Sequence, residues 1–289
     1  MKPEMLQQAI ELYDRFTHEG MDRRDFFNRM TLIAGSAAAA TSLVAAIAAS
    51  PAAAAIVPPE DPRLDTKKGP LGGKSGLSGY TAVRKGLKRG GLVLVIHENR
   101  GLNPHIEDVA RRLALEGFVV VAPDILTPLG GTPTDADKAR EMIGKLDLGA
   151  AAKSVMLLGE ERRKMAPANG KLGIVGFCWG GAFVNHVSAG SGDKLDAAVS
   201  YYGPAPDPSE AVNVKAPVMI HHAGTDTRVA ATLFPWVAAL RAAKKPVTYY
   251  GYDGANHAFN NDTSAERYNK EAADLAWART IRFFKRHLG

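Results

Sequence analysis

The fold is decided at residues 172–181, which read LGIVGFCWGG. The first half of this stretch is a nearly continuous apolar run, which is typical of a β-strand buried on both faces of a sheet. Gly176 and Gly180 flank Cys178 at positions −2 and +2 and permit a sharp turn into a helix that begins near Trp179. We therefore expect the cysteine to stand at the apex of a strand-to-helix turn.

Strands and helices alternate on both sides of this turn, which predicts an α/β fold with a mostly parallel twisted sheet and helices on both faces. Apolar runs predict strands at 92–96, 118–122, 197–201, 217–220 and 247–252. Helical spacing predicts helices at 103–115, 134–147, 149–165, 229–243 and 264–286. In such a sheet the functional groups gather in loops at the carboxyl ends of the strands.

Cys178 is the only cysteine of the 289 residues, which excludes an internal disulfide and every multi-cysteine metal motif. Its glycine pattern is that of the nucleophile elbow G-x-S-x-G, with sulfur in place of the hydroxyl. The N–H groups at a helix N-terminus favour a negative charge and thus the thiolate. The alternative interpretation is a buried, inert cysteine that packs as a small hydrophobic residue.

A nucleophile of this kind needs a base and an orienting acid, which elbow hydrolases carry in the chain order nucleophile, acid, histidine. Asp226 follows the strand predicted at 217–220, and His257 follows the strand predicted at 247–252. Neither residue is informative alone. Order and placement together predict a catalytic triad of Cys178, Asp226 and His257.

The loop after the strand at 92–96 reads His97-Glu98-Asn99-Arg100-Gly101. In this architecture it supplies one backbone N–H of an oxyanion hole, and the residue after the nucleophile supplies the other. Asn99 and Trp179 are therefore the predicted oxyanion donors. Glu98 is a candidate second acid–base group, and Arg100 either binds an anionic group of the substrate or forms a structural ion pair.

These residues belong to a longer pattern over roughly 75–289. It comprises His97-Glu98, Gly101-Leu102, Ile106-Glu107-Asp108-Val109-Ala110-Arg111-Arg112-Leu113, Gly117, Ala122-Pro123-Asp124, Cys178 in G-x-C-x-G-G, Asp226 and His257. The pattern resembles the dienelactone hydrolases (carboxymethylenebutenolidases) of the α/β-hydrolase superfamily. The resemblance implies hydrolysis of a lactone or ester through a covalent thioester. It also implies that Glu98 holds the resting thiol protonated and takes its proton when substrate displaces it.

The chain departs from this family where the substrate binds. The family arginine four residues beyond the catalytic histidine, which binds a substrate carboxylate, is Asn261 here, and Arg140 is only a loose candidate for the second such arginine. Tyr202 and Phe259 are candidates for the pocket wall. We expect a lactone or ester hydrolase, with a broad-specificity esterase, an acyltransferase or a non-catalytic periplasmic ligand-binding protein as alternatives.

No cofactor is expected, and no metal. Several histidines stand near strand ends, namely His97, His221, His222 and His257. However, no HExxH or comparable ligand spacing accompanies them, so a metal-dependent mechanism is not favoured.

Residues 1–60 form a predicted leader ahead of a catalytic domain at 61–289. The pair Arg23-Arg24 precedes Phe26-Phe27, residues 30–59 carry no charge, and Ala53-Ala54-Ala55 offers small residues for cleavage. This order predicts a signal for the twin-arginine export machinery and a periplasmic or exported location. An uncleaved membrane anchor is the alternative, although the small residues of the run make a stable span unexpected.

The start of the leader is open, since either Met1 or Met21 could be the first residue. Leu6, Ile10 and Tyr13 fall at helical spacing, so residues 1–20 are compatible with a short amphipathic helix.

The leader also affects the charge balance. The chain has 36 basic and 30 acidic residues; residues 1–60 carry 5 and 7 of them, which leaves 31 and 23 beyond. The excess of basic residues beyond residue 60 is not accompanied by an aromatic platform for single strands or by a helix-turn-helix motif. A solvated basic face is therefore favoured over nucleic-acid binding.

Overall fold

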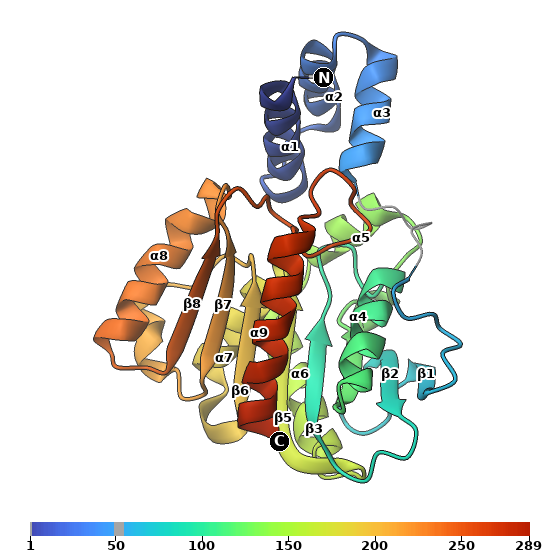
Figure 1. The fold of residues 1–289 in the computed structure, drawn as a ribbon, viewed down its shortest axis with the longest axis vertical. Coiled ribbons are helices and arrows are strands. Elements are labelled where there is room, and N and C mark those ends of the chain that lie inside the picture. Colours follow the sequence, from blue (N-terminus) through green and yellow to red (C-terminus); the bar gives the residue numbers. More distant parts are fainter. Residues whose placement is uncertain (1, 49–54) are drawn as a thin grey trace.

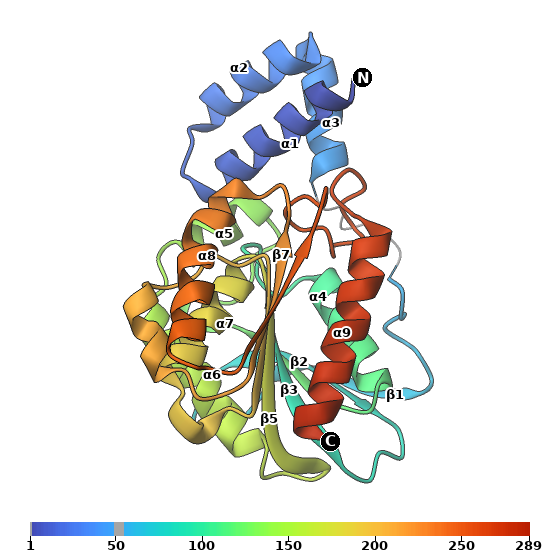
Figure 2. The same ribbon diagram turned by 60° about the vertical axis from the view of Figure 1, so that its left-hand side comes forward.

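The computed structural model describes residues 2–48 and 55–289, and within them the chain forms an eight-stranded sheet with helices on both faces (Figures 1 and 2). The strands are β1 (Leu64–Pro70), β2 (Ser78–Arg84), β3 (Gly90–Ile96), β4 (Val119–Asp124), β5 (Ala168–Phe177), β6 (Ala197–Tyr201), β7 (Val218–Ala223) and β8 (Val247–Tyr252). Their order in the sheet is β1-β2-β4-β3-β5-β6-β7-β8.

The sheet is parallel from β4 through β3 to β8, and β2 is antiparallel to both of its neighbours. This confirms the predicted mostly parallel sheet and each of the predicted strands. The edge strand β1 and its neighbour β2, the two antiparallel strands, were not predicted, because β1 is largely exposed and neither has the continuous apolar run of a strand buried on both faces.

Two layers of helices bury the sheet. The helices of this part are α4 (Pro104–Leu115), α5 (Ala136–Ile143), α6 (Leu148–Arg162), α7 (Trp179–Gly190), α8 (Thr227–Ala242) and α9 (Lys270–Leu288), with short 3₁₀ turns at Thr127–Leu129, Gly192–Lys194 and Pro208–Asn213. Alternate residues of β3 face opposite sides: Val93 and Val95 pack with α4 and α9, whereas Leu92 and Leu94 pack with α6, α7 and α8.

The last helix begins six residues later than predicted, at Lys270 instead of residue 264. Asn269 caps it by accepting a hydrogen bond from the Ala272 N–H. Residues 258–269 form turns instead of a helix, and they connect His257 to α9 above the sheet. This loop supplies several of the contacts described below.

Three further helices lie over the carboxyl ends of the strands, at the top of Figure 1: α1 (Pro3–His18), α2 (Arg23–Ala34) and α3 (Ala37–Ile47). Helix α1 confirms the amphipathic helix expected within residues 1–20, with Ile10 and Tyr13 buried. The three helices share a small core of their own, in which the rings of Phe16 and Phe26 stack at 4.1 Å between centroids. We call residues 3–47 the cap.

The cap also contains the segment predicted to act as an export signal. Among the described residues no single helix is long and apolar enough to span a bilayer; α2 and α3 pass such a test only as a pair, with a bend of 103° between them. Met1 and the predicted cleavage residues Ala53 and Ala54 lie outside the described residues.

Candidate active site

Cys178 stands between the end of β5 and the start of α7 in a left-handed conformation, with φ 57° and ψ −116°. Both flanking glycines are needed for this turn. A Cβ at Gly176 would lie 2.0 Å from the Gly180 carbonyl oxygen, and one at Gly180 would lie 2.5 Å from the His97 carbonyl oxygen. The sharp turn predicted from the sequence is therefore present, with the thiol at its apex.

Asp226 and His257 reach the site from the ends of the two neighbouring strands β7 and β8. Asp226 Oδ2 accepts a hydrogen bond from His257 Nδ1 over 2.6 Å, while its Oδ1 accepts one from the Val229 N–H and caps α8. Both of its carboxylate oxygens are thus fixed. The His257 ring is oriented with its other nitrogen, Nε2, towards the sulfur, and Nε2 and Sγ lie within 4.8 Å of each other.

The electrostatics of this pair follow from burial and charge. Burial alone would lower the pKa of His257, but its interaction with Cys178 and its hydrogen bond to Asp226 raise that pKa to about 10. Burial would raise the pKa of Asp226, whereas the hydrogen bond and charge of His257 hold it below the ordinary range. Asp226 therefore stays ionised and favours the imidazolium form of His257.

Glu98 lines the same small cavity as Cys178 and His257. Its Oε2 accepts a hydrogen bond from Asn261 Nδ2 over 2.9 Å, and its Oε1 has no partner among the described residues. Asn261 in turn accepts hydrogen bonds at Oδ1 from the Thr263 N–H and hydroxyl. Asn261, which the sequence marked only as a departure from the family, is therefore a residue that positions Glu98.

The other predicted residues of the loop after β3 also reach the site. Asn99 lines the cavity with Glu98, and Trp179 begins α7 directly after the cysteine, with its indole stacked on His97 at 5.6 Å. Arg100 lines the cavity too, and its guanidinium donates a hydrogen bond to the Tyr13 hydroxyl. Arg140 lies apart from these residues, over the ring of Phe16.

Tyr202 and Phe259 are not among the residues that line the cavity. Both are fully buried, and the ring of Tyr202 packs against those of His257 and Phe259 at 5.1 and 5.4 Å. Tyr202 therefore supports the His257 ring, and Phe259 supports Tyr202.

The histidines that the sequence offered as alternative metal ligands do not gather at one point. His97 accepts a hydrogen bond at Nε2 from the Ile125 N–H, and His221 is bonded to the hydroxyls of Tyr252 and Thr280. His222 pairs with the Tyr249 hydroxyl. Of the four, only His257 belongs to the site.

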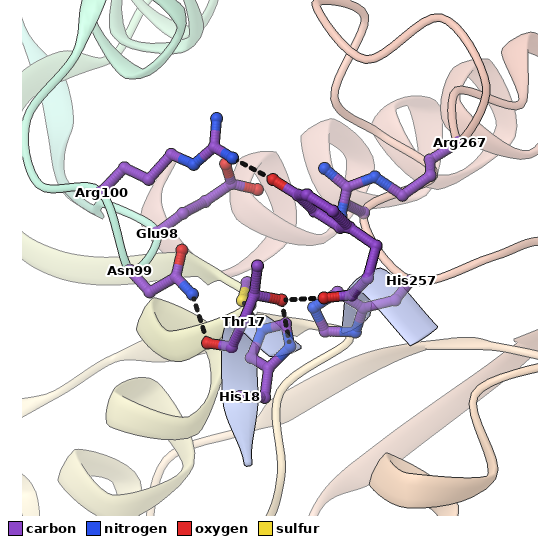
Figure 3. A pocket seen from close by; sticks show the side chains of 10 residues that line it. Thr17, His18, Glu98, Asn99, Arg100, His257 and Arg267 are labelled. Carbon is purple, nitrogen blue, oxygen red and sulfur yellow. Dashed lines mark hydrogen bonds between the residues drawn. The ribbon is translucent and has the colours of Figure 1, made fainter. Parts of the chain in front are cut away.

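A residue that sequence reasoning missed completes the site from the cap. His18, the last residue of α1, places its Nε2 3.1 Å from Cys178 Sγ (Figure 3), and its ring lies 4.7 Å from that of His257. Burial, together with the charge of His257, holds the pKa of His18 well below its ordinary value. Only the helical spacing of residues 1–20 hinted that this segment folds.

The cap is held over the site by hydrogen bonds and an ion pair. The Asn99 side chain donates to the Thr17 carbonyl oxygen over 3.3 Å, and Arg267 pairs with Asp14 over 3.3 Å. At the other end of the cap, the Ile47 carbonyl oxygen accepts hydrogen bonds from the Ser264 hydroxyl and from Arg267. These contacts attach α1 and α3 to the loops that follow β3 and β8.

The space left above the sulfur is small. A cavity of about 20 Å³ lies among Tyr13, Thr17, His18, Glu98, Asn99, Arg100, Cys178, His257, Ala258 and Arg267. That volume holds one water molecule. A substrate carbonyl cannot approach Sγ while His18 occupies this position.

The order of the strands, the helices on both faces and the cysteine elbow define an α/β-hydrolase. A solved structure from Klebsiella pneumoniae, named for dienelactone hydrolase, has the same fold with a TM-score of 0.70 and 26% identity, covering 77% of this chain and 98% of that one. The Dienelactone hydrolase family matches residues 77–288, and the chain belongs to that family of hydrolases, which act on lactone or ester bonds.

Curated relatives agree with this assignment. A Yersinia pestis protein is 31% identical over 211 residues, covering 68% of this chain and 78% of its own length. A protein of Saccharolobus solfataricus is 30% identical over 230 residues, covering 67% and 88%. Both are named for carboxymethylenebutenolidase. The family match begins at residue 77, so the cap lies outside it.

Proposed function

We propose that the chain hydrolyses a lactone or carboxylic ester through a covalent thioester on Cys178. The observation that carries this proposal is the relay from Asp226 through His257 to a thiol at the apex of an elbow. A buried cysteine with no role would need neither a left-handed backbone nor a histidine fixed by a carboxylate.

The reaction follows from the positions of these groups. Sγ attacks the carbonyl carbon, and the backbone N–H groups of Trp179 and Asn99 stabilise the oxyanion that forms. The tetrahedral adduct collapses, the C–O bond breaks, and His257 gives its proton to the leaving alkoxide. His257 then takes a proton from water, the hydroxide attacks the thioester, and the C–S bond breaks to release the acid and restore Cys178.

Glu98 has a separate task in this proposal, which the family resemblance suggests. It keeps the thiol protonated at rest, accepts that proton when substrate enters, and returns it to the sulfur after the acid has been released. Its fixation by Asn261 and its unpartnered Oε1, both at the cavity that the sulfur lines, support this assignment.

While the cap is attached, turnover also requires it to move, because His18 stands where the carbonyl must approach. We propose that the closed chain is a resting state and that substrate reacts with an open fraction of molecules. The apparent affinity then falls in proportion to that fraction. Arg100 and Arg267, which the cap now engages, become available to an anionic group of the substrate.

The test is acylation of the full chain by p-nitrophenyl acetate. We expect a burst of p-nitrophenolate approaching one equivalent per chain, and one acetyl group on the peptide that contains Cys178 by mass spectrometry. The His257→Ala variant keeps the only thiol of the chain but lacks the imidazolium that stabilises the thiolate, so its acylation should be much slower. Equal acylation rates in the two proteins contradict the proposal.

The alternatives predict other outcomes. A non-catalytic binding protein retains an ester stoichiometrically and releases no product. An acyltransferase releases less free acid when an alcohol or amine acceptor is added, because the acyl group partitions to that acceptor. We expect hydrolysis whose yield of acid is unchanged by such acceptors.

We also propose that the twin-arginine pathway exports the chain to the periplasm. The paired arginines and the uncharged run at residues 30–59 support this, and removal of the segment after export would also uncover the active site. We expect residues 1–60 to export a folded reporter, and the change of Arg23 and Arg24 to lysine to stop that export. Arg29→Lys is the matched control. Export that survives the double change contradicts the proposed pathway.

A further inference from the structure

Three potential ligand atoms of a metal site meet where the cap touches the hydrolase. His18 Nε2, Cys178 Sγ and His257 Nε2 all lie within 4.8 Å of one another. We propose that these side chains bind one zinc-class metal ion, and that the bound ion fastens the cap over the active site. The site exists only with the cap closed, because α1 supplies one of its ligands.

Both imidazoles are oriented as metal ligands are. His257 donates through Nδ1 to Asp226, and His18 Nδ1 lies 2.7 Å from the Asp14 carbonyl oxygen. A carbonyl oxygen only accepts, so the Nδ1 of His18 carries the hydrogen and its Nε2 presents a lone pair to the sulfur. An oxygen partner at the second ring nitrogen is the usual support of a histidine that binds metal.

A second observation comes from an unpartnered atom. His257 Nε2 is buried and, apart from its interaction with Cys178, has no hydrogen-bond partner among the described residues. Buried polar nitrogens rarely remain unpaired in native proteins. A metal ion between this nitrogen, His18 Nε2 and Cys178 Sγ would satisfy it.

The separations are in the range that a tetrahedral ion can draw together. With Zn–S near 2.3 Å and Zn–N near 2.0–2.1 Å, tetrahedral ligands place sulfur and nitrogen about 3.5 Å apart. His18 Nε2 and Cys178 Sγ are now 3.1 Å apart and must separate by a few tenths of an ångström, while the His257 nitrogen lies within 4.8 Å of both. The cavity of about 20 Å³ beside them has room for one water as the fourth ligand.

The ligand set also selects the class of metal. One thiolate and two imidazoles suit Zn²⁺ and copper, whereas Mg²⁺ and Ca²⁺ prefer oxygen ligands. Binding releases the proton shared by Cys178 and its two histidines to solvent, and forms one metal–sulfur and two metal–nitrogen bonds. The bound ion would hold the sulfur and the His257 nitrogen and would therefore inhibit the proposed hydrolysis. This inhibition rests on the proposed function, whereas metal binding itself does not.

The test uses Co²⁺ and Zn²⁺ with the metal-free full chain. We expect one Co²⁺ per chain with the intense visible bands of tetrahedral cobalt and a cobalt–thiolate absorption, which Zn²⁺ abolishes by displacement. We also expect Zn²⁺ to raise the melting temperature. His18→Ala should weaken Co²⁺ binding by at least about 100-fold. The loss of a residue that only supports a metal ligand already lowers metal affinity 10- to 100-fold, and His18 is itself a proposed ligand.

His287→Ala is the matched control, because it removes a histidine from the far end of α9 and should leave the affinity unchanged. Circular dichroism of metal-free His18→Ala shows whether that variant is folded. If folded His18→Ala binds Co²⁺ as tightly as the parent, or if the parent binds none, the site does not exist as proposed. Acylation of metal-free protein tests the hydrolase separately, so the two proposals fail independently.

Discussion

Asn261 donates a hydrogen bond to Glu98 across 2.9 Å, and Thr263 fixes the asparagine by donating to its side-chain oxygen. The amide is therefore locked with its NH₂ group towards the carboxylate. Glu98 has a fixed orientation in the cavity that Cys178 also lines. The dienelactone hydrolases that degrade aromatic compounds have a substrate-binding arginine at this position. In this chain the position is Asn261, whose side-chain amide holds Glu98, the candidate second acid–base group.

Asn261→Ala tests this relationship. A hydrogen bond to a charged group contributes about 1.5–3 kcal/mol, so a poorly oriented Glu98 should lower kcat by roughly 10- to 100-fold. The neighbouring Asn260 is equally buried, and its side-chain nitrogen has no hydrogen-bond partner among the described residues. Asn260→Ala is thus the matched control and should change kcat little. Steady-state ester hydrolysis measures both, and equal losses would remove the special role of Asn261.

Asp14→Lys should open the cap. Asp14 faces Arg267 at 3.3 Å, and the substitution replaces that attraction with repulsion between two positive charges in a buried place. A larger open fraction raises the apparent affinity for substrate. We expect kcat/KM for a bulky ester to rise at least about tenfold.

Glu11→Lys makes the same charge change on an exposed position of α1 and serves as the control. It should leave kcat/KM unchanged, because it touches none of the contacts that hold the cap. A kcat/KM for Asp14→Lys that equals the parent value would mean that the cap does not limit access of substrate.

The sheet and the candidate triad could be predicted from the sequence because their signals are local. A buried strand, two glycines and one cysteine determine the elbow, and the strand ends then indicate Asp226 and His257. His18, which Figure 3 shows at the pocket, could not be found in this way: it lies 160 residues from Cys178 in the chain, and nothing near it in the sequence marks a site. Its role depends on how the cap docks.

The same limit applies to Asn261 and Glu98. Spacing from His257 identified Asn261 as a missing arginine, but its partner comes from the loop after β3, 163 residues earlier. The antiparallel strands β1 and β2 were missed for a different reason, since their partial burial leaves no continuous apolar run.

Asp226→Asn should separate catalysis from stability. Asparagine caps a helix about as well as aspartate, so α8 keeps the hydrogen bond from the Val229 N–H and the unfolding free energy should change little. The loss of the charge that orients His257 should lower kcat by about 10⁴-fold, as in other triads. Asp226→Ala removes both functions and should cost about 1 kcal/mol of stability in addition. Urea unfolding and kcat of both variants test this, and a catalytically competent Asp226→Asn refutes the relay.

Stability towards acid should depend on His221, which is buried between β6 and β8 and bonded to the hydroxyls of Tyr252 and Thr280. Burial, with repulsion from Arg279, lowers the pKa of His221 to about 3 in the folded state. An unfolded histidine titrates near 6.5. Below pH 6.5 the unfolded chain therefore binds a proton at His221 that the folded chain does not bind. The free energy of unfolding then falls by about 1.4 kcal/mol per pH unit down to about pH 3.

From pH 7 to pH 5 this one residue should cost about 2 kcal/mol of unfolding free energy. His221→Gln removes the titration while keeping a polar side chain, so its stability should fall about 2 kcal/mol less than that of the parent over this range. His186→Gln, on α7, removes a partly exposed histidine instead and should keep the parent's slope. Urea unfolding at the two pH values measures the difference. If the stability of the His221→Gln protein falls as steeply with pH as that of the parent, the acid sensitivity originates at other residues, because the variant has no titrating group at position 221.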